Sequence, residues 1–416
     1  MIRLRLLGSA VALGVAALAA TFAFGGARDP YRGIPAGFDF PVREDALLGY
    51  LRDKDEISMR RHVWAIWAGI NEPAASGGPL WETWTPEEQV FASGPSPQDD
   101  AARAPAKFRR PRQFEDSGAS PQAAGQALLS FVLFNREAKE HVRTNKLHLK
   151  STMDAINAGF GPAVPVADRK IPDFPAASVV LKTAWWVVKS TGRTTIPVWD
   201  ASTAAAPSTP QPPDDWKRAV RVDPTRVDIP TGETESVAPF GACRVVPLSD
   251  FYFVRIDSAE MLAEVVAALG ASGVQSQNPA LHDYVVLVGM HLTTKEIPDW
   301  VWATFWWHDA AGAGPFAAQR PSSMPRPWSS YLMDVTLDAD SPTEPGGGPN
   351  VCYNPWLEAR FQDGIVSNCM GCHQKALWPQ GVPFGPVQRG RLPAGDPIFR
   401  DRTKTDFLWS LNFGPH

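Results

Sequence analysis

The chain has 416 residues, of which 44% are hydrophobic, and a formal net charge of −4 at pH 7. This length and hydrophobic content indicate a globular protein with a sizeable core, in one large or two ordinary domains. The chain has no excess of basic over acidic residues, which nucleic-acid-binding proteins usually have, so no nucleic acid is expected as a partner. The 40 prolines indicate long irregular connections, and the 16 tryptophans suit a large flat apolar partner, although packing alone also explains them.

Residues 1–27 have the pattern of an export leader. Arg3 and Arg5 precede an uncharged apolar run from Leu6 to Phe24, which is typical of a secretory signal peptide. The run is also nearly long enough to span a bilayer, so an uncleaved inner-membrane anchor that tethers the protein is the alternative. Either interpretation predicts a periplasmic or otherwise exported protein.

We predict an α+β fold, whose first region, residues 35–160, is mainly helical. Apolar residues recur at helical spacing over 45–70 and again over 122–149. Residues 93–122, between these two stretches, are rich in Pro, Ala, Arg and Asp, a composition that predicts a long surface loop.

Residues 165–340 are predicted to mix strands and helices. A helix should follow Asp257, and strands are expected over 178–189, 251–256, 284–292 and 300–309. Side chains alternate along a strand, so Met290 and His291 should point to opposite faces. Residues 350–416 are predicted to be mostly loops and short helices, one of them over 405–411, packed on the rest of the protein.

The feature around which the sequence is organised is Cys369-Met370-Gly371-Cys372-His373, a C-x-x-C-H pattern. The pattern is typical of covalent attachment of c-type haem, since two thiols at this spacing can add to the two vinyl groups of one porphyrin. The histidine that follows is placed to bind the iron. We therefore expect Cys369 and Cys372 to anchor one haem c and His373 to be its proximal axial ligand.

Other interpretations of this cysteine pair are a disulfide, a thioredoxin-like redox pair or half of a zinc site. A zinc site needs a second ligand pair, whereas the remaining cysteines, Cys243 and Cys352, are isolated. A thioredoxin-like pair belongs early in a βαβ unit rather than in a proline-rich C-terminal region. In an oxidising compartment, Cys243 and Cys352 are candidates for a disulfide that ties the haem segment to the rest of the protein.

The haem segment, residues 350–416, resembles the c-type cytochromes. In small members of that family, a Gly-Pro soon after the haem histidine supplies the carbonyl that accepts the proximal ring N–H, and Gly385-Pro386 stand in that place. The distal methionine of those proteins has no counterpart, since no methionine follows Cys372. A self-contained small cytochrome is therefore not expected, and the haem should pack against the preceding residues.

Three stretches are also similar to a group of large secreted bacterial monohaem proteins. They are 300–305 (WVWATF), 367–373 (SNCMGCH) and 406–411 (DFLWSL). This resemblance spans most of the chain but names no substrate.

The function depends on the ligand opposite His373. A histidine or methionine there makes the iron six-coordinate, which suits electron transfer, whereas an open position admits oxygen, peroxide or nitric oxide. His308, at the end of a tryptophan-rich strand face, is the first candidate, followed by His291 and then Met290 or Met324. The sequence thus predicts an exported monohaem c-type cytochrome with a redox partner protein. The alternative is a haem enzyme or gas-binding protein with an open distal position in a tryptophan-rich pocket.

Overall fold

The computed structural model describes residues 39–75, 77–95, 129–161, 163–200, 211–271, 277–340, 350–359, 367–380 and 390–415. The leader expected over 1–27 and the Gly385-Pro386 pair lie outside these residues. Within the described ranges, no helix is both long and apolar enough to cross a membrane. The elements confirm the predicted α+β class, with helices around mainly antiparallel sheets.

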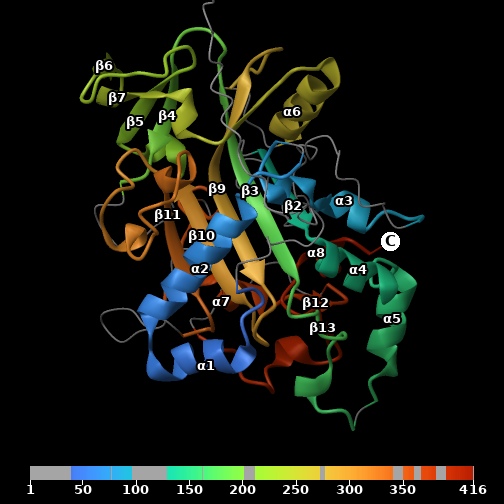
Figure 1. The fold of residues 1–416 in the computed structure, drawn as a ribbon. Coiled ribbons are helices and arrows are strands. Elements are labelled where there is room, and N and C mark those ends of the chain that lie inside the picture. The colour runs from blue at the N-terminus through green and yellow to red at the C-terminus, as the bar shows by residue number, and fades with distance from the viewer. Residues whose placement is uncertain are drawn as a thin grey trace, which may run out of the picture.

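The centre of the molecule is an antiparallel sheet with strand order β1-β2-β3-β9-β10-β11, to which β8 adds by pairing with β9 (Figure 1). All residues of β2, β10 and β11 are buried, which explains why these strands are predominantly apolar. The strands are β1 (Thr85–Pro86), β2 (Leu129–Phe134), β3 (Val179–Val188), β8 (Phe253–Arg255), β9 (Tyr284–Thr294), β10 (Val301–Trp307) and β11 (Tyr331–Thr336).

Helix α2 (Glu56–Ile70) crosses one face of this sheet (Figure 1). The ring of Trp67 stacks on Phe305 of β10 with 4.0 Å between centroids, an arrangement that contributes about 0.5–1.5 kcal/mol beyond the buried area. Helix α1 (Glu44–Asp53) precedes α2. The single helix expected over 45–70 is therefore divided, because Lys54 takes a left-handed conformation and Asp55 caps α2 by accepting a hydrogen bond from the Ser58 amide.

The C-terminal region covers the opposite face, which we call the α7 face after helix α7 (Cys369–His373). The amide of Asn354 donates to Thr304 Oγ1 over 2.7 Å and to the Phe305 carbonyl over 2.9 Å. Gly289 permits this close approach, since a Cβ at that position would lie 3.2 Å from Asn354 Oδ1. The central sheet is thus enclosed between α2 and the segment that carries the C-x-x-C-H pattern.

A second sheet has the order β4-β5-β7-β6, with β5 and β7 parallel. Its strands are β4 (Thr194–Val198), β5 (Arg218–Asp223), β6 (Thr234–Val237) and β7 (Gly241–Pro247), at the upper left of Figure 1. The remaining elements are α3 (Glu87–Val90), α4 (Arg136–Thr144), α5 (Lys150–Gly159), α6 (Ala259–Ala271), α8 (Ser410–Phe413) and the small pair β12 (Leu377–Trp378) and β13 (Thr403–Lys404). Short 3₁₀ helices lie at Leu80–Thr83, Val166–Asp168, Pro213–Asp215, Leu248–Asp250, Pro315–Ala317, Trp328–Ser330 and Pro397–Phe399.

The predicted strands over 178–189, 251–256, 284–292 and 300–309 and the helix after Asp257 are confirmed as β3, β8, β9, β10 and α6. The helix predicted over 122–149 is wrong for residues 129–134, which form β2. That run is apolar at every position but one and is buried on both faces, so helical spacing could not be distinguished from a strand. Because β2 pairs with β3, the central sheet joins the region 35–160 to the region 165–340.

Candidate functional site

Helix α7 carries all three residues of the C-x-x-C-H pattern and is fixed to the central sheet. Asn368 caps the helix by accepting a hydrogen bond from the Gly371 amide over 3.0 Å. The side-chain amide of Asn368 also donates to the Ala339 carbonyl, just beyond β11, over 2.9 Å. Cys369 is buried and Cys372 is partly exposed, and neither is in a disulfide.

The ring of His373 is held in one orientation. Its Nδ1 lies 2.7 Å from the carbonyl oxygen of Phe407, and because a carbonyl only accepts, Nδ1 carries the proton. Burial lowers the pKa of His373 to about 3, and positive charge on His291 and Lys182 acts in the same direction. The imidazole is therefore neutral at ordinary pH, and Nε2 is left as a free lone pair, the form that binds a metal.

A strained turn aims the Phe407 carbonyl at His373. Asp406 and Phe407 both have left-handed backbone conformations, with φ of 50° and 65°, and each costs about 1–2 kcal/mol for an L-residue. The helix predicted over 405–411 is therefore wrong at its start, and α8 begins only at Ser410. The ring N–H of His373 therefore donates to the Phe407 carbonyl, and not to the carbonyl expected from the Gly385-Pro386 pattern.

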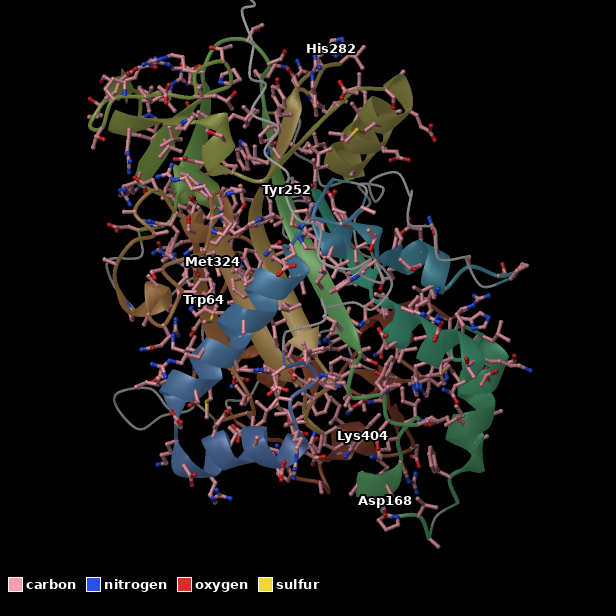
Figure 2. All side chains as sticks on the ribbon, in the orientation of Figure 1. Trp64, Asp168, Tyr252, His282, Met324 and Lys404 are labelled. Atoms are coloured by element: carbon pink, nitrogen blue, oxygen red, sulfur yellow. The ribbon has the colours of Figure 1, made fainter. Side chains whose placement is uncertain are left out.

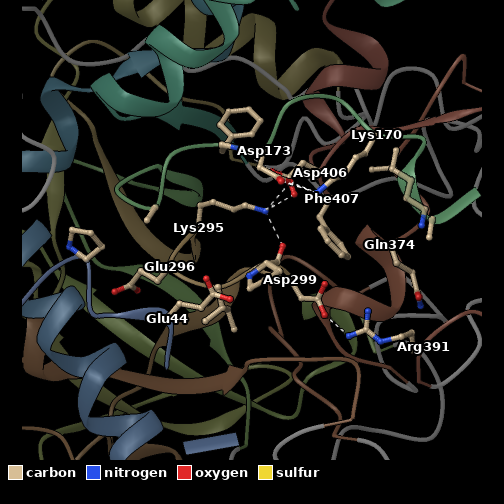
Figure 3. A pocket seen from close by; sticks show the side chains of 18 of the residues that line it. Glu44, Lys170, Asp173, Lys295, Glu296, Asp299, Gln374, Arg391, Asp406 and Phe407 are labelled. Carbon is tan, nitrogen blue, oxygen red and sulfur yellow. Dashed lines mark hydrogen bonds and ion pairs between the residues drawn. The ribbon is translucent and has the colours of Figure 1, made fainter. Parts of the chain in front are cut away.

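A buried ion pair holds this turn in place (Figure 3). Lys295 Nζ lies 2.6 Å from Asp406 Oδ1, and each side chain is only 5% exposed. Lys295 also donates to the Pro298 carbonyl over 2.8 Å, and the second oxygen of Asp406 accepts from the Phe174 amide over 3.2 Å. Nothing in the sequence indicated that Lys295 pairs with Asp406 beside His373, since no local pattern links them.

The three stretches that carry the resemblance to secreted monohaem proteins meet at His373. The ring of Trp302, in the first stretch, lies 4.4 Å from the ring of His373, in the second. Phe407, in the third, supplies the carbonyl acceptor, and its ring lies 6.5 Å from that of Trp302. Residues distant in the sequence are thus gathered around one imidazole.

His291 lies on the same face of the sheet as His373 and Trp302. It pairs across the sheet with Thr304, two residues beyond Trp302, so it is a diagonal neighbour of Trp302 at about 7–8 Å. Its buried Nε2 has no hydrogen-bond partner among the described residues: Glu358 Oε1 is 3.2 Å away, but not in hydrogen-bond geometry. The structure therefore brings His291 into the neighbourhood of the C-x-x-C-H helix.

The other distal candidates lie elsewhere. His308 is six residues beyond Trp302, about 20 Å further along the strand direction, where its Nδ1 accepts a hydrogen bond from the Ala310 amide over 2.9 Å. Met290 is buried on the α2 side, as strand alternation predicts. Met324 is buried in the same large apolar cluster as Met290 and Trp64, and Figure 2 labels Met324 and Trp64.

The structure does not bring Cys243 and Cys352 together, and both are free thiols. Cys243 lies in β7 of the second sheet, where its Sγ donates to the Gly241 carbonyl over 3.6 Å. Cys352 is buried beside Cys369, and the hydrogen bond between the two thiols raises the pKa of Cys352. Cys352 therefore neighbours Cys369, the first cysteine of the C-x-x-C-H pattern, and not Cys243.

No family model, no curated protein and no solved structure matches this chain.

Proposed function

We propose that the protein is an exported monohaem c-type cytochrome that transfers electrons, with one haem c attached to Cys369 and Cys372. The observation that carries this proposal is the orientation of His373, whose Nδ1–H is bound by the Phe407 carbonyl so that Nε2 is free as the proximal ligand. An imidazole held in this way is more basic and points in a fixed direction, as metal-binding histidines require.

The surroundings of α7 fit a covalently bound porphyrin. Two thiols and the oriented imidazole lie on one short helix. Cys369 and Met370 pack in one apolar cluster with Phe134 and Val180 of the central sheet, which supplies an apolar wall of low dielectric constant. Haem, when bound, supplies one-electron redox chemistry; the residues of this chain anchor it, orient the proximal imidazole and exclude water.

We further propose His291 as the distal ligand. Its Nε2 is a buried nitrogen without a hydrogen-bond partner among the described residues, on the face that carries His373. A buried polar atom without a hydrogen bond is costly, and coordination to iron would satisfy it. Two histidine ligands would make the iron six-coordinate, which favours electron exchange with a redox partner protein over binding of small molecules. Attachment of haem c outside the cytoplasm agrees with the leader predicted over 1–27.

The proximity of Glu358 to His291 favours a second candidate function. A carboxylate 3.2 Å from Nε2 can draw the imidazole away from the iron. The distal position would then be open, and His291 with Glu358 could move a proton beside a bound small molecule. This arrangement would belong to a haem enzyme or gas-binding protein.

Optical spectra of the full-length protein, exported together with a haem-attachment system, test these proposals. We expect a covalently bound haem that remains on the chain after denaturation and a ferrous spectrum that carbon monoxide leaves unchanged. Cys372→Ala should lose the stable two-bond attachment, whereas Cys243→Ala, a buried cysteine of the second sheet, should retain it. Absence of covalent haem in the native protein would refute the proposed function, and a shift with carbon monoxide would favour the second candidate.

A further inference from the structure

A cavity of about 770 Å³ lies beside the candidate haem site (Figure 3). Gln374, which directly follows His373, and Phe407, whose carbonyl holds that histidine, both line it. Its volume is within the range of about 300–1,000 Å³ that is typical of small-molecule sites. The cavity therefore has room for a ligand next to the residues that orient the proximal imidazole.

Most of the cations that line this cavity are already neutralised. Lys170 pairs with Asp173, Lys295 with Asp406, Arg391 with Asp299, and Arg43 with Asp45. Lys404 differs, since no carboxylate of the described residues lies within ion-pair distance of its ammonium group. Lys404 Nζ lies instead 4.7 Å from the ring centroid of Phe399.

The position of Lys404 is set by the backbone on both sides. Its amide donates to the Arg169 carbonyl over 2.8 Å, and its carbonyl accepts from the Ile171 amide over 3.1 Å. Partial burial lowers the pKa of Lys404, and the positive charges of Arg391 and Lys170 add to this effect, whereas the negative charges of Asp168 and Asp299 act against it. Lys404 is thus a partly buried cation in a fixed backbone position, without a described carboxylate at ion-pair distance, and an anion beside it would be favourable.

An apolar surface lies beneath this cation. Phe399 and Leu392 are buried in one small cluster with Leu377, and both also line the cavity. A fixed ammonium group beside apolar side chains is complementary to a molecule with one negatively charged end and an apolar body. A phosphate or another fully polar anion would leave the apolar surface unused.

We propose that this cavity binds a small organic carboxylate, whose charged group pairs with Lys404 and whose apolar body lies on Phe399 and Leu392. The same cavity is lined by Lys295, Asp406 and Phe407, the residues that orient His373. A bound carboxylate therefore alters the electrostatic field at the proximal ligand, and the reduction potential of the haem shifts. This coupling rests on the proposed function, whereas binding itself does not.

Calorimetric titration of the full-length protein with benzoate and with hexanoate tests the proposal. We expect saturable binding at a single site, and binding of the neutral analogue benzamide about tenfold weaker or more, because it lacks the charge-assisted contact. Lys404→Met should weaken benzoate binding by a similar factor, and Lys404→Arg should retain it. Lys217→Met, which removes an exposed lysine outside the cavity, is the matched control and should bind as the native protein does.

Equal affinity for benzoate and benzamide, unchanged benzoate binding by Lys404→Met at native thermal stability, or no saturable binding of either carboxylate would overturn the proposal. Titrations of haem-loaded and haem-free protein distinguish failure of the carboxylate site from failure of the proposed function, since the calorimetric signal does not require haem. If the native protein carried no covalent haem but still bound benzoate, only the proposed cytochrome function would be refuted. A benzoate-dependent potential shift that disappears in Lys404→Met would support both.

Discussion

Replacement of Asp406 by asparagine tests how His373, the proposed proximal ligand, is held. Asp406 pairs with Lys295 in a site where both side chains are 5% exposed, and its left-handed backbone directs the next carbonyl to His373. Asparagine keeps the shape of the side chain and tolerates the left-handed conformation. The substitution therefore removes the charge while the backbone geometry remains accessible.

The expected loss of stability follows from the burial of the pair. Breaking a buried ion pair by removal of one partner costs about 3–5 kcal/mol. We expect about 3 kcal/mol, at the lower end of that range, because the asparagine oxygen can still accept from Lys295. Urea denaturation, with the slope m unchanged, measures this loss as a lower midpoint.

The reduction potential of the proposed haem should rise in the same variant. A less firmly held Phe407 carbonyl accepts a weaker hydrogen bond from His373, so the imidazole becomes less basic and stabilises ferric iron less. A tenfold change in the relative stability of the two oxidation states corresponds to about 59 mV for one electron. Redox titration should therefore find an increase of tens of millivolts.

A double variant separates the effect of Asp406 on the position of the turn from the effect of the charge on Lys295. Asp406→Asn alone leaves the positive charge of Lys295 with only the more distant Asp173 carboxylate, 4.0 Å from Nζ, whereas Asp406→Asn with Lys295→Met removes that charge. Stability should partly recover in the double variant, but the potential should stay raised, because the anchor of the turn is still absent. Asp215→Asn, at an exposed carboxylate of the 3₁₀ helix Pro213–Asp215 outside this cavity, is the control and should change neither quantity. A native midpoint or a native potential in Asp406→Asn would refute this account of the turn.

Three further predictions concern other parts of the protein. His291→Ala should make the ferrous spectrum sensitive to carbon monoxide, whereas His308→Ala should leave it insensitive, because His308 lies far along the sheet; equal behaviour of the two variants would refute the assignment of His291. Alkylation of the unfolded protein without reductant should modify both Cys243 and Cys352, and a mass that reveals a disulfide between them would contradict their separation. Burial raises the pKa of Glu82 from 4.5 to about 7, so the folded state binds more protons between these values. Its contribution to stability is then fully present below pH 4.5 and lost as the pH rises through 7. Denaturation at pH 5 and pH 8 should show this difference in the native protein, and Glu82→Gln should remove that contribution.

The sequence alone was sufficient for the features that depend on neighbouring residues. The C-x-x-C-H pattern is local, since one turn of helix suffices to place its thiols and imidazole together, and α7 forms there with Asn368 as its cap. The opposite orientations of Met290 and His291 likewise follow from strand alternation. The strand 129–134 was missed because a short apolar run buried on both faces has no period of its own.

The tertiary structure decided which distant residues meet at the site. His291 and His308 are both strand or strand-end histidines, and only the register of β9 against β10 shows that the former lies near Trp302. The register depends on how a whole strand packs, so it cannot be read from either segment alone. The acceptor for His373 is supplied by Phe407 because Lys295, more than a hundred residues earlier, anchors the turn through Asp406. Such contacts depend on chain packing across the molecule, and no local pattern of residues encodes them.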